Sequence, residues 1–185
     1  NSLGAVWSSC SPDFGKQGVL DRLSQIEPKV LFCTDGYWYN GKRHDVRDKT
    51  ASIAAELPSL VKTVMLPYGD LDADIGSIQN AVTFADATQD ITPTDVSFKQ
   101  LPFDHPLYIM FSSGTTGAPK CIIHSQGGTL LKHASEQPIH CDVRKDDRVF
   151  FYTTCGWMMW NWLATNIAWG ATLILYDGSP FYPSG

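Results

Sequence analysis

The sequence predicts an α/β fold with a mostly parallel sheet and flanking helices. Short apolar runs of strand type alternate along the chain with segments whose apolar residues recur at helical spacing. This alternation is typical of parallel strands joined by right-handed helical crossovers. The last third of the chain also reads as a complete strand–helix–strand unit, which favours the same fold class.

The first half of the chain is expected to provide three strands and two helices. The expected strands are the apolar runs 5–10 (AVWSSC), 29–34 (KVLFCT, expected to be buried) and 61–68 (VKTVMLPY). The expected helices have apolar residues on one face, namely Val19, Leu20, Leu23 and Ile26 in the first and Ile53, Ala54 and Leu57 in the second. Pro58 ends the second helix. The glycine and aromatic residues at 36–39 indicate a turn.

The second half begins with an irregular segment and continues with recognisable helices and strands. The scattered Asp, Thr, Pro and Gly of residues 69–106 predict a surface segment with one short element at 81–85. A helix over 127–137 is expected to begin near Ser125 and to have Leu130, Leu131 and Ala134 on one side. The strand–helix–strand unit follows over 149–154, 158–168 and 171–176, and Gly170 ends its helix.

Composition excludes several classes of protein. Of the 185 residues, 43% are hydrophobic and 18% are charged, as in an ordinary globular protein. The formal net charge is -5 and the basic residues are scattered, so nucleic acid and anionic membranes are not expected partners. The absence of an apolar run of about 18 residues argues against membrane insertion.

The cysteines and histidines predict reduced thiols and no metal site. The five cysteines are odd in number and widely spaced, which favours the cytosol. Three histidines lie near Cys141, but their spacing matches no compact ligand pattern. The chain opens on Asn1 and stops at FYPSG without a cap, so we expect an internal piece of a longer protein.

The loop SSGTTGAPK, residues 112–120, is the strongest candidate site in the chain. It lacks bulky side chains from Ser112 to Gly117, so its backbone amides can approach a ligand closely. Four hydroxyl groups lie beside those amides, and Lys120 adds a positive charge. Such donors suit a polyphosphate, whose oxygens accept hydrogen bonds and whose charge must be compensated.

A Walker A loop and a simple hairpin turn are the two other interpretations of this loop. A Walker A loop does not fit, because Pro119 stands where the second glycine is needed and Cys121 where serine or threonine is needed. The β-branched run 121–125 (CIIHS) predicts strand–loop–strand instead of strand–loop–helix. A simple hairpin turn remains the alternative, since Gly, Ser and Thr are common in turns.

The stretch YIMFSSGTTGAPKCIIHS resembles the phosphate-loop signature of the adenylate-forming superfamily, which includes acyl-CoA synthetases, luciferases and peptide-synthetase adenylation domains. The stretch RVFFYTTCGWMMWNWLATNIAWGATLILYDGSPFYP is similar to the acetyl-CoA synthetase branch. Within that branch, TTCGWMMWNWL and LYDGSPFYP closely resemble the members that activate acetoacetate. The resemblance runs from GAVWSSCSPDFG to the C-terminal end.

The resemblance implies two groups of site residues. The expected ATP-phosphate contacts are Ser112, Ser113, Gly114, Thr115, Thr116 and Gly117, with Lys120 stabilising phosphate charge nearby. The expected acyl-pocket residues are Gly156, Trp157, Met158, Met159 and Asn161. The donor for a 3-keto oxygen stays open between Asn161, the Trp157 indole and the backbone near Gly156.

The resemblance also implies how the chain is organised. The 185 residues correspond to the central part of the large N-terminal AMP-binding domain. Residues 1–106 form an α/β segment, 107–125 the strand–loop–strand, and 126–185 a helix plus the acyl-pocket segment. The magnesium ligands and the C-terminal lid domain are expected outside these residues, so we expect the piece alone to be inactive.

The implied activity is that of a cytosolic acid–thiol ligase. It joins acetoacetate to coenzyme A with ATP and Mg²⁺ through an acyl-adenylate, which suits ketone-body use in fatty acid and other lipid metabolism. The alternatives are a ligase for acetate or another short acid, and a truncated non-catalytic product that binds nucleotide or a partner. The sequence does not indicate an oligomeric state.

Overall fold

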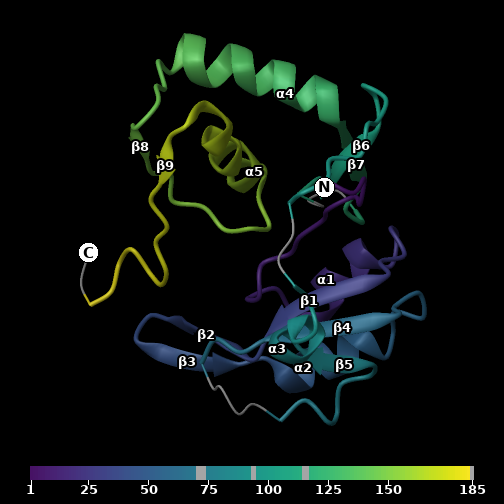
Figure 1. Cartoon of the computed structure of the whole chain (residues 1–185). Helices are drawn as coiled ribbons and strands as arrows, with labels where there is room; N and C mark the ends of the chain where they lie inside the picture. Colours follow the sequence, from purple (N-terminus) through teal and green to yellow (C-terminus); the bar gives the residue numbers. More distant parts are fainter. Residues whose placement is uncertain (70–73, 93–94, 114–116, 184–185) are drawn as a thin grey trace. The chain divides into compact units, whose positions relative to one another are not determined.

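The computed structural model describes residues 1–69, 74–92, 95–113 and 117–183 (Figure 1). The chain divides into two compact units. The loop unit comprises Asn1–Ser11 with Thr94–Tyr176, and the sheet unit comprises Pro12–Pro93 with Asp177–Gly185. Both units contain strands and helices, which confirms the predicted α/β class.

A three-stranded parallel sheet organises the sheet unit. Its strand order is β1 (Val30–Thr34), β4 (Lys62–Leu66) and β5 (Ala81–Thr83). Met65 and Thr63 in the middle strand are fully buried. The strand predicted over 29–34 is present, but its predicted burial is wrong. It forms an edge of the sheet, so Val30 and Phe32 stay about half exposed.

Helices α1 (Lys16–Leu23) and α2 (Arg47–Ala54) pack against each other in this unit. The helical faces read from the sequence are confirmed for Val19, Leu20, Leu23, Ile53 and Ala54, which are buried. Ile26 and Leu57 lie beyond the ends of the helices, and of these two Leu57 is buried and Ile26 is half-buried. The short element expected at 81–85 is β5 followed by α3 (Phe84–Thr88). The Thr83 hydroxyl caps α3 by accepting the Asp86 N–H at 3.0 Å.

The stretch predicted as a turn at 36–39 is instead a strand. It forms an antiparallel hairpin of β2 (Gly36–Tyr39) with β3 (Lys42–Asp45). Asn40 and Gly41 connect the strands with φ angles of 50° and 73°. Positive φ at both central residues is the geometry that an Asn-Gly dipeptide favours in a two-residue hairpin. That dipeptide was the signal for this hairpin.

Asp35 ties the strand ends of the sheet unit together. Its side chain is fully buried and accepts hydrogen bonds from Arg43 Nη2 at 2.8 Å, Tyr68 N at 2.6 Å and Gly69 N at 3.1 Å. Burial opposes ionisation, but the two backbone N–H groups and the guanidinium outweigh it and hold the pKa of Asp35 below its usual value. The carboxylate therefore joins the hairpin to the segment that follows β4.

In the loop unit, β6 (Pro106–Phe111) and β7 (Cys121–Ser125) pair antiparallel around the candidate phosphate loop. The predicted strand–loop–strand is thus confirmed. The strand predicted over 5–10 is reduced to one parallel bridge between Trp7 and Tyr108. It still pairs with β6, since Trp7 N donates to Leu107 O at 3.1 Å and Ile109 N donates to Trp7 O at 2.8 Å.

Helix α4 (Gln126–Ala134) follows β7 directly and begins at Ser125, whose hydroxyl accepts the Gly128 N–H at 3.2 Å. A π-helical turn, η1 (Ser135–His140), continues it through Pro138. The apolar face predicted for this helix is wrong, because Leu130 and Leu131 are 51% and 62% exposed. The inward residues are Thr129, His133 and Gln137. Gln137 faces inward because its hydrogen-bond partners lie there.

The predicted strand–helix–strand unit is present with shorter strands. It consists of β8 (Arg148–Val149), α5 (Met158–Thr165), the 3₁₀ turn η2 (Asn166–Trp169) and β9 (Thr172–Leu173). The two strands pair parallel over two residues each. Gly170 ends the helical segment in the left-handed region at φ 80°, as predicted. In the described part of the chain, no helix has the length and apolar character needed to span a membrane.

Replacing Asp35 by Asn in the intact protein should destabilise the sheet unit by about 2–4 kcal/mol, because the Arg43 guanidinium and two N–H groups lose a buried anion. The pKa of Asp35 is lower when folded than its unfolded value of about 3.9. This stabilisation is therefore present above that pH and is lost as the pH falls through the folded pKa. Denaturant unfolding at several pH values measures both effects.

The matched control is Glu56→Gln. Glu56 pairs with Lys16 and both side chains are exposed, so its loss should cost less than about 1 kcal/mol. Equal losses for the two variants at neutral pH would contradict the role given to Asp35.

Candidate functional site

The candidate phosphate loop is closed at its base by its own first and last residues. Ser112 N donates to Lys120 O at 3.0 Å, and Lys120 N donates to the Ser112 hydroxyl at 2.9 Å. Ser113, Gly117 and Lys120 are exposed. The predicted contacts Gly114, Thr115 and Thr116 lie outside the described residues. Two hydrogen bonds therefore fix the base of the loop. The exposed Ser113 hydroxyl and Lys120 ammonium groups are accessible to a ligand.

The backbone conformation at residue 117 favours glycine, although there is room for a larger side chain. Its φ is 150°, and a Cβ placed there would meet no atom within 4 Å. L-residues rarely adopt that angle, so any side chain at this position is strained. Pro119, in contrast, is buried and anchors the returning arm of the loop.

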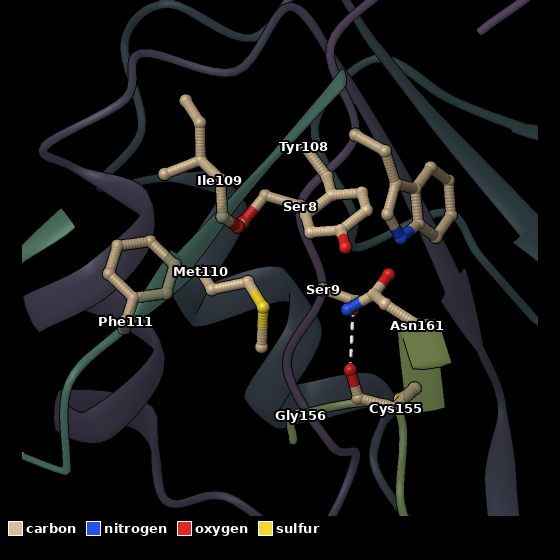
Figure 2. Close-up of a pocket in the computed structure, with 10 residues that line it drawn as sticks. Ser8, Ser9, Tyr108, Ile109, Met110, Phe111, Cys155, Gly156 and Asn161 are labelled. Atoms are coloured by element: carbon tan, nitrogen blue, oxygen red, sulfur yellow. Dashed lines mark hydrogen bonds between the residues drawn. The ribbon is translucent and has the colours of Figure 1, made fainter. Parts of the chain in front are cut away.

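A pocket lies alongside β6 in the loop unit (Figure 2). Three segments of the chain form its walls: the N-terminal residues 7–9, the β6 residues 108–111, and residues 155, 156 and 161 at the start of α5. Because β6 runs directly into Ser112, the pocket and the candidate phosphate loop share one strand. This strand therefore sets the position of the pocket relative to the loop base.

Side-chain hydrogen bonds connect the pocket walls. The Ser8 hydroxyl donates to Ile109 O at 2.8 Å, and the Ser9 hydroxyl donates to Cys155 O at 2.5 Å. The Cys155 thiol in turn donates to Cys10 O at 3.3 Å. These contacts hold the N-terminal segment between β6 and the approach to α5.

The structure brings together two of the five residues predicted for the acyl pocket. Gly156 and Asn161 line the pocket, whereas Trp157, Met158 and Met159 do not. Trp157 is 57% exposed, Met158 is about half exposed, and Met159 is half-buried. Figure 2 shows the Asn161 carboxamide between the Tyr108 ring and Cys155. The predicted pocket residues thus divide between the pocket wall and the surface beside it.

Gln137 holds α5 in place, and sequence reasoning missed it. Its side chain is fully buried, with Nε2 donating to Trp162 O and Oε1 accepting from Trp169 Nε1, both at 2.5 Å. The adjoining Asn166 is also fully buried and donates to Trp162 O and Leu163 O at 3.1 and 3.0 Å. One signal for this was available in the sequence. Thr129, His133 and Gln137 are spaced four residues apart, which places three polar side chains on one helical face.

Other residues of the site also gave no direct signal in the sequence. Ser8, Ser9 and the β6 side chains join the pocket from positions far from residue 155 in the chain. The one available clue was that β6 immediately precedes the loop. Among the described residues, no three His, Cys, Asp or Glu side chains are grouped so that they could hold a metal ion.

Comparison with known proteins identifies a family. The family model described as AMP-binding enzyme matches residues 1–184. The chain is 58% identical over its full length to the acetoacetyl-coenzyme A synthetase of Rhizobium meliloti (strain 1021), and it spans 28% of that protein. It is 46% identical to a malonamoyl-CoA synthetase of Penicillium aethiopicum, with 98% of the chain and 26% of the relative covered.

A solved structure gives the same result. The acetoacetyl-CoA synthetase from Streptomyces lividans matches with a TM-score of 0.91 and 45% identity. The match covers 99% of this chain and 27% of that one. The chain therefore spans between a quarter and a third of the length of these relatives.

Replacing Gln137 by Leu should destabilise the loop unit of the intact protein by about 1–3 kcal/mol, because the Trp169 indole N–H loses its acceptor and the Trp162 carbonyl loses one of its two side-chain donors. Denaturant unfolding measures the loss. In the control Gln126→Met, the amide nitrogen removed is buried without a partner among the described residues, so stability should stay within about 1 kcal/mol. A larger loss for Gln126→Met than for Gln137→Leu would contradict this assignment.

Proposed function

Because the chain belongs to the AMP-binding enzyme family, we propose that the intact protein is an acetoacetate–CoA ligase. It converts acetoacetate, ATP and coenzyme A into acetoacetyl-CoA, AMP and pyrophosphate through an acyl-adenylate. The observation that carries this proposal is the similarity, over the whole chain, to relatives named as acetoacetyl-CoA synthetases.

The loop at 112–120 serves as the ATP-phosphate site in this proposal. Ser112, Ser113, Gly117 and Lys120, with residues 114–116 between them, contact the β- and γ-phosphates. The closed loop base and the exposed positions of Ser113 and Lys120 support this role. Pre-placed donors and one positive charge stabilise the charge that develops on the leaving pyrophosphate.

The acid is proposed from the chemistry that the relatives' names share. Acetoacetate and malonamate both carry a carbonyl group at C3, next to the methylene that bears the carboxylate. Acetate and propionate have no such group. A ligase that prefers the first pair needs a hydrogen-bond donor in its acyl pocket, because an unpaired buried carbonyl costs about 1–3 kcal/mol.

The chain acts in this proposal as the central part of the AMP-binding N-terminal domain of a longer cytosolic protein. Supporting this, it covers 28% of the length of its relatives. The proposal includes Mg²⁺ with the bound ATP and assigns its ligands to residues outside the 185. The partners are the small molecules acetoacetate, ATP and coenzyme A, and the 185 residues alone are inactive.

An acid panel on the intact protein tests the proposed function. Pyrophosphate release is measured with acetoacetate, malonamate, acetate, propionate and butyrate at saturating ATP. The expected kcat/KM for acetoacetate exceeds that for acetate and butyrate by at least about 10-fold. A pocket that donates a hydrogen bond to the keto group favours acids that carry this group by at least this factor. Acetate as the best substrate, or release that no acid stimulates, would refute the proposal.

Replacing Lys120 by Met should lower kcat/KM for ATP by about 100-fold, the usual scale for removing one group that stabilises developing negative charge. Acetoacetate-dependent pyrophosphate release by the intact protein measures the change. Lys99→Met is the matched control, because Lys99 is an exposed lysine of the same unit outside the loop. Equal rates for Lys120→Met and the control would remove Lys120 from the phosphate site.

A further inference from the structure

We propose that His133 makes the attachment of α4 to β6 and β7 sensitive to pH, so that mild acidification loosens the two strands that carry the candidate phosphate loop. This device belongs to the loop unit itself and goes beyond the proposed ligase activity. Three features of the unit support it: a buried histidine, the groups that face that histidine, and the way α4 is fastened to the strands.

His133 is a buried titratable side chain on the inward face of α4. Only 5% of it is exposed, and its Nδ1 atom is buried with no hydrogen-bond partner among the described residues. Protonation makes both ring nitrogens donors, so at Nδ1 the added N–H would meet no acceptor in that part of the chain. The imidazolium charge would also lose its solvation by water. Burial therefore lowers the pKa of His133 below its usual value of 6.5.

The groups around His133 do little to offset this cost. His124 on β7 and Lys132 on α4 oppose a positive charge at His133, and Glu136 in η1 favours it. On β6, burial raises the pKa of Tyr108, so its hydroxyl group adds no negative charge. Helix α5 and the turn η2 bond to the neighbouring Gln137, and residues 158–169 contain no titratable side chain. Glu136 is thus the one anion that acts on His133 among these groups.

Helix α4 holds the end of the strand pair that lies away from the loop. It follows β7 directly and packs against both strands (Figure 1). Its first residue, Gln126, donates its backbone N–H to His105 O at 2.9 Å, just before β6 begins. Tyr108 and His124 are register partners across the two strands. Detachment of α4 would therefore remove support from β6 and β7 together.

The sign of the effect follows from the direction of the pKa shift. The pKa of His133 is lower in the attached form than its value of about 6.5 in an open form, so the open form binds the additional proton first. The stabilisation by neutral His133 is complete above about pH 6.5 and declines as the pH falls below that value. Because one proton is involved, the equilibrium constant for opening rises by at most about tenfold per pH unit. The decline ends below the pKa of the attached form.

Hydrogen exchange of the intact protein tests this inference. Mass spectrometry follows peptides that cover residues 106–134 from about pH 7.5 to about pH 5.0, and each rate is divided by the intrinsic chemical rate at that pH. In wild type, the protection of these peptides should fall below about pH 6.5, by up to about tenfold per pH unit. In His133→Gln, which keeps a polar and uncharged side chain, it should stay within about twofold. Constant protection in wild type, or an equal fall in His133→Gln, overturns the inference.

The matched control is His140→Gln, because His140 is an exposed histidine of η1. Its protection profile should follow that of wild type within about twofold. A constant profile in this variant would assign the pH dependence to His140 and overturn the inference.

Glu136→Gln covers the case in which His133→Gln does not fold. It removes the anion that favours the protonated imidazole, so the fall in protection should be about two- to fivefold larger than in wild type. An unchanged or smaller fall in this variant overturns the inference.

A second readout rests on the proposed function, because it uses the ligase activity. During incubation at about pH 5.0, the half-life of acetoacetate-dependent pyrophosphate release should be about three- to tenfold longer for His133→Gln than for wild type. Equal half-lives would overturn the inference. An intact protein without this activity at neutral pH would refute the proposed function, while the exchange experiment would still decide the inference.

Discussion

The pairing of β6 on both of its edges is the constraint on which the loop unit depends. Trp7 bonds to Leu107 and Ile109 on one edge, and β7 pairs antiparallel on the other. Tyr108 in the middle of the strand is buried, and its ring lies 5.0 Å from that of His124. A strand fixed on both edges gives the candidate phosphate loop a defined starting point at Ser112.

In each unit, buried polar side chains bond to neighbouring elements and fix how those elements lie against each other, which apolar packing alone would not do. In the sheet unit, Asp35 collects donors from the hairpin and from the end of β4. In the loop unit, Gln137 and Asn166 bond to backbone carbonyls of α5. Such groups are costly unless every partner is in place, so they favour one arrangement of the elements over its neighbours.

Local patterns in the sequence were enough for most of the helices and for the strand–loop–strand around residues 112–120. The helical faces with Leu20 and Ile53 and the strand–loop–strand around 112–120 depend on residues close together in the chain, where spacing is informative. The Asn40–Gly41 hairpin was equally local and was overlooked. The face of α4 was mispredicted because Gln137 finds its partners 25 and 32 residues away, which no local pattern reveals. The pocket was hidden for the same reason, since Ser9 meets Cys155 across 146 residues.

A crystal structure of the intact protein with acetoacetate and a non-hydrolysable ATP analogue tests the central claim most directly. That claim is that β6 and β7 hold residues 112–120 as the ATP-phosphate site. The account predicts β- and γ-phosphate oxygens about 3 Å from hydrogen-bond donors of residues 112–120. Phosphates bound away from this loop would contradict it.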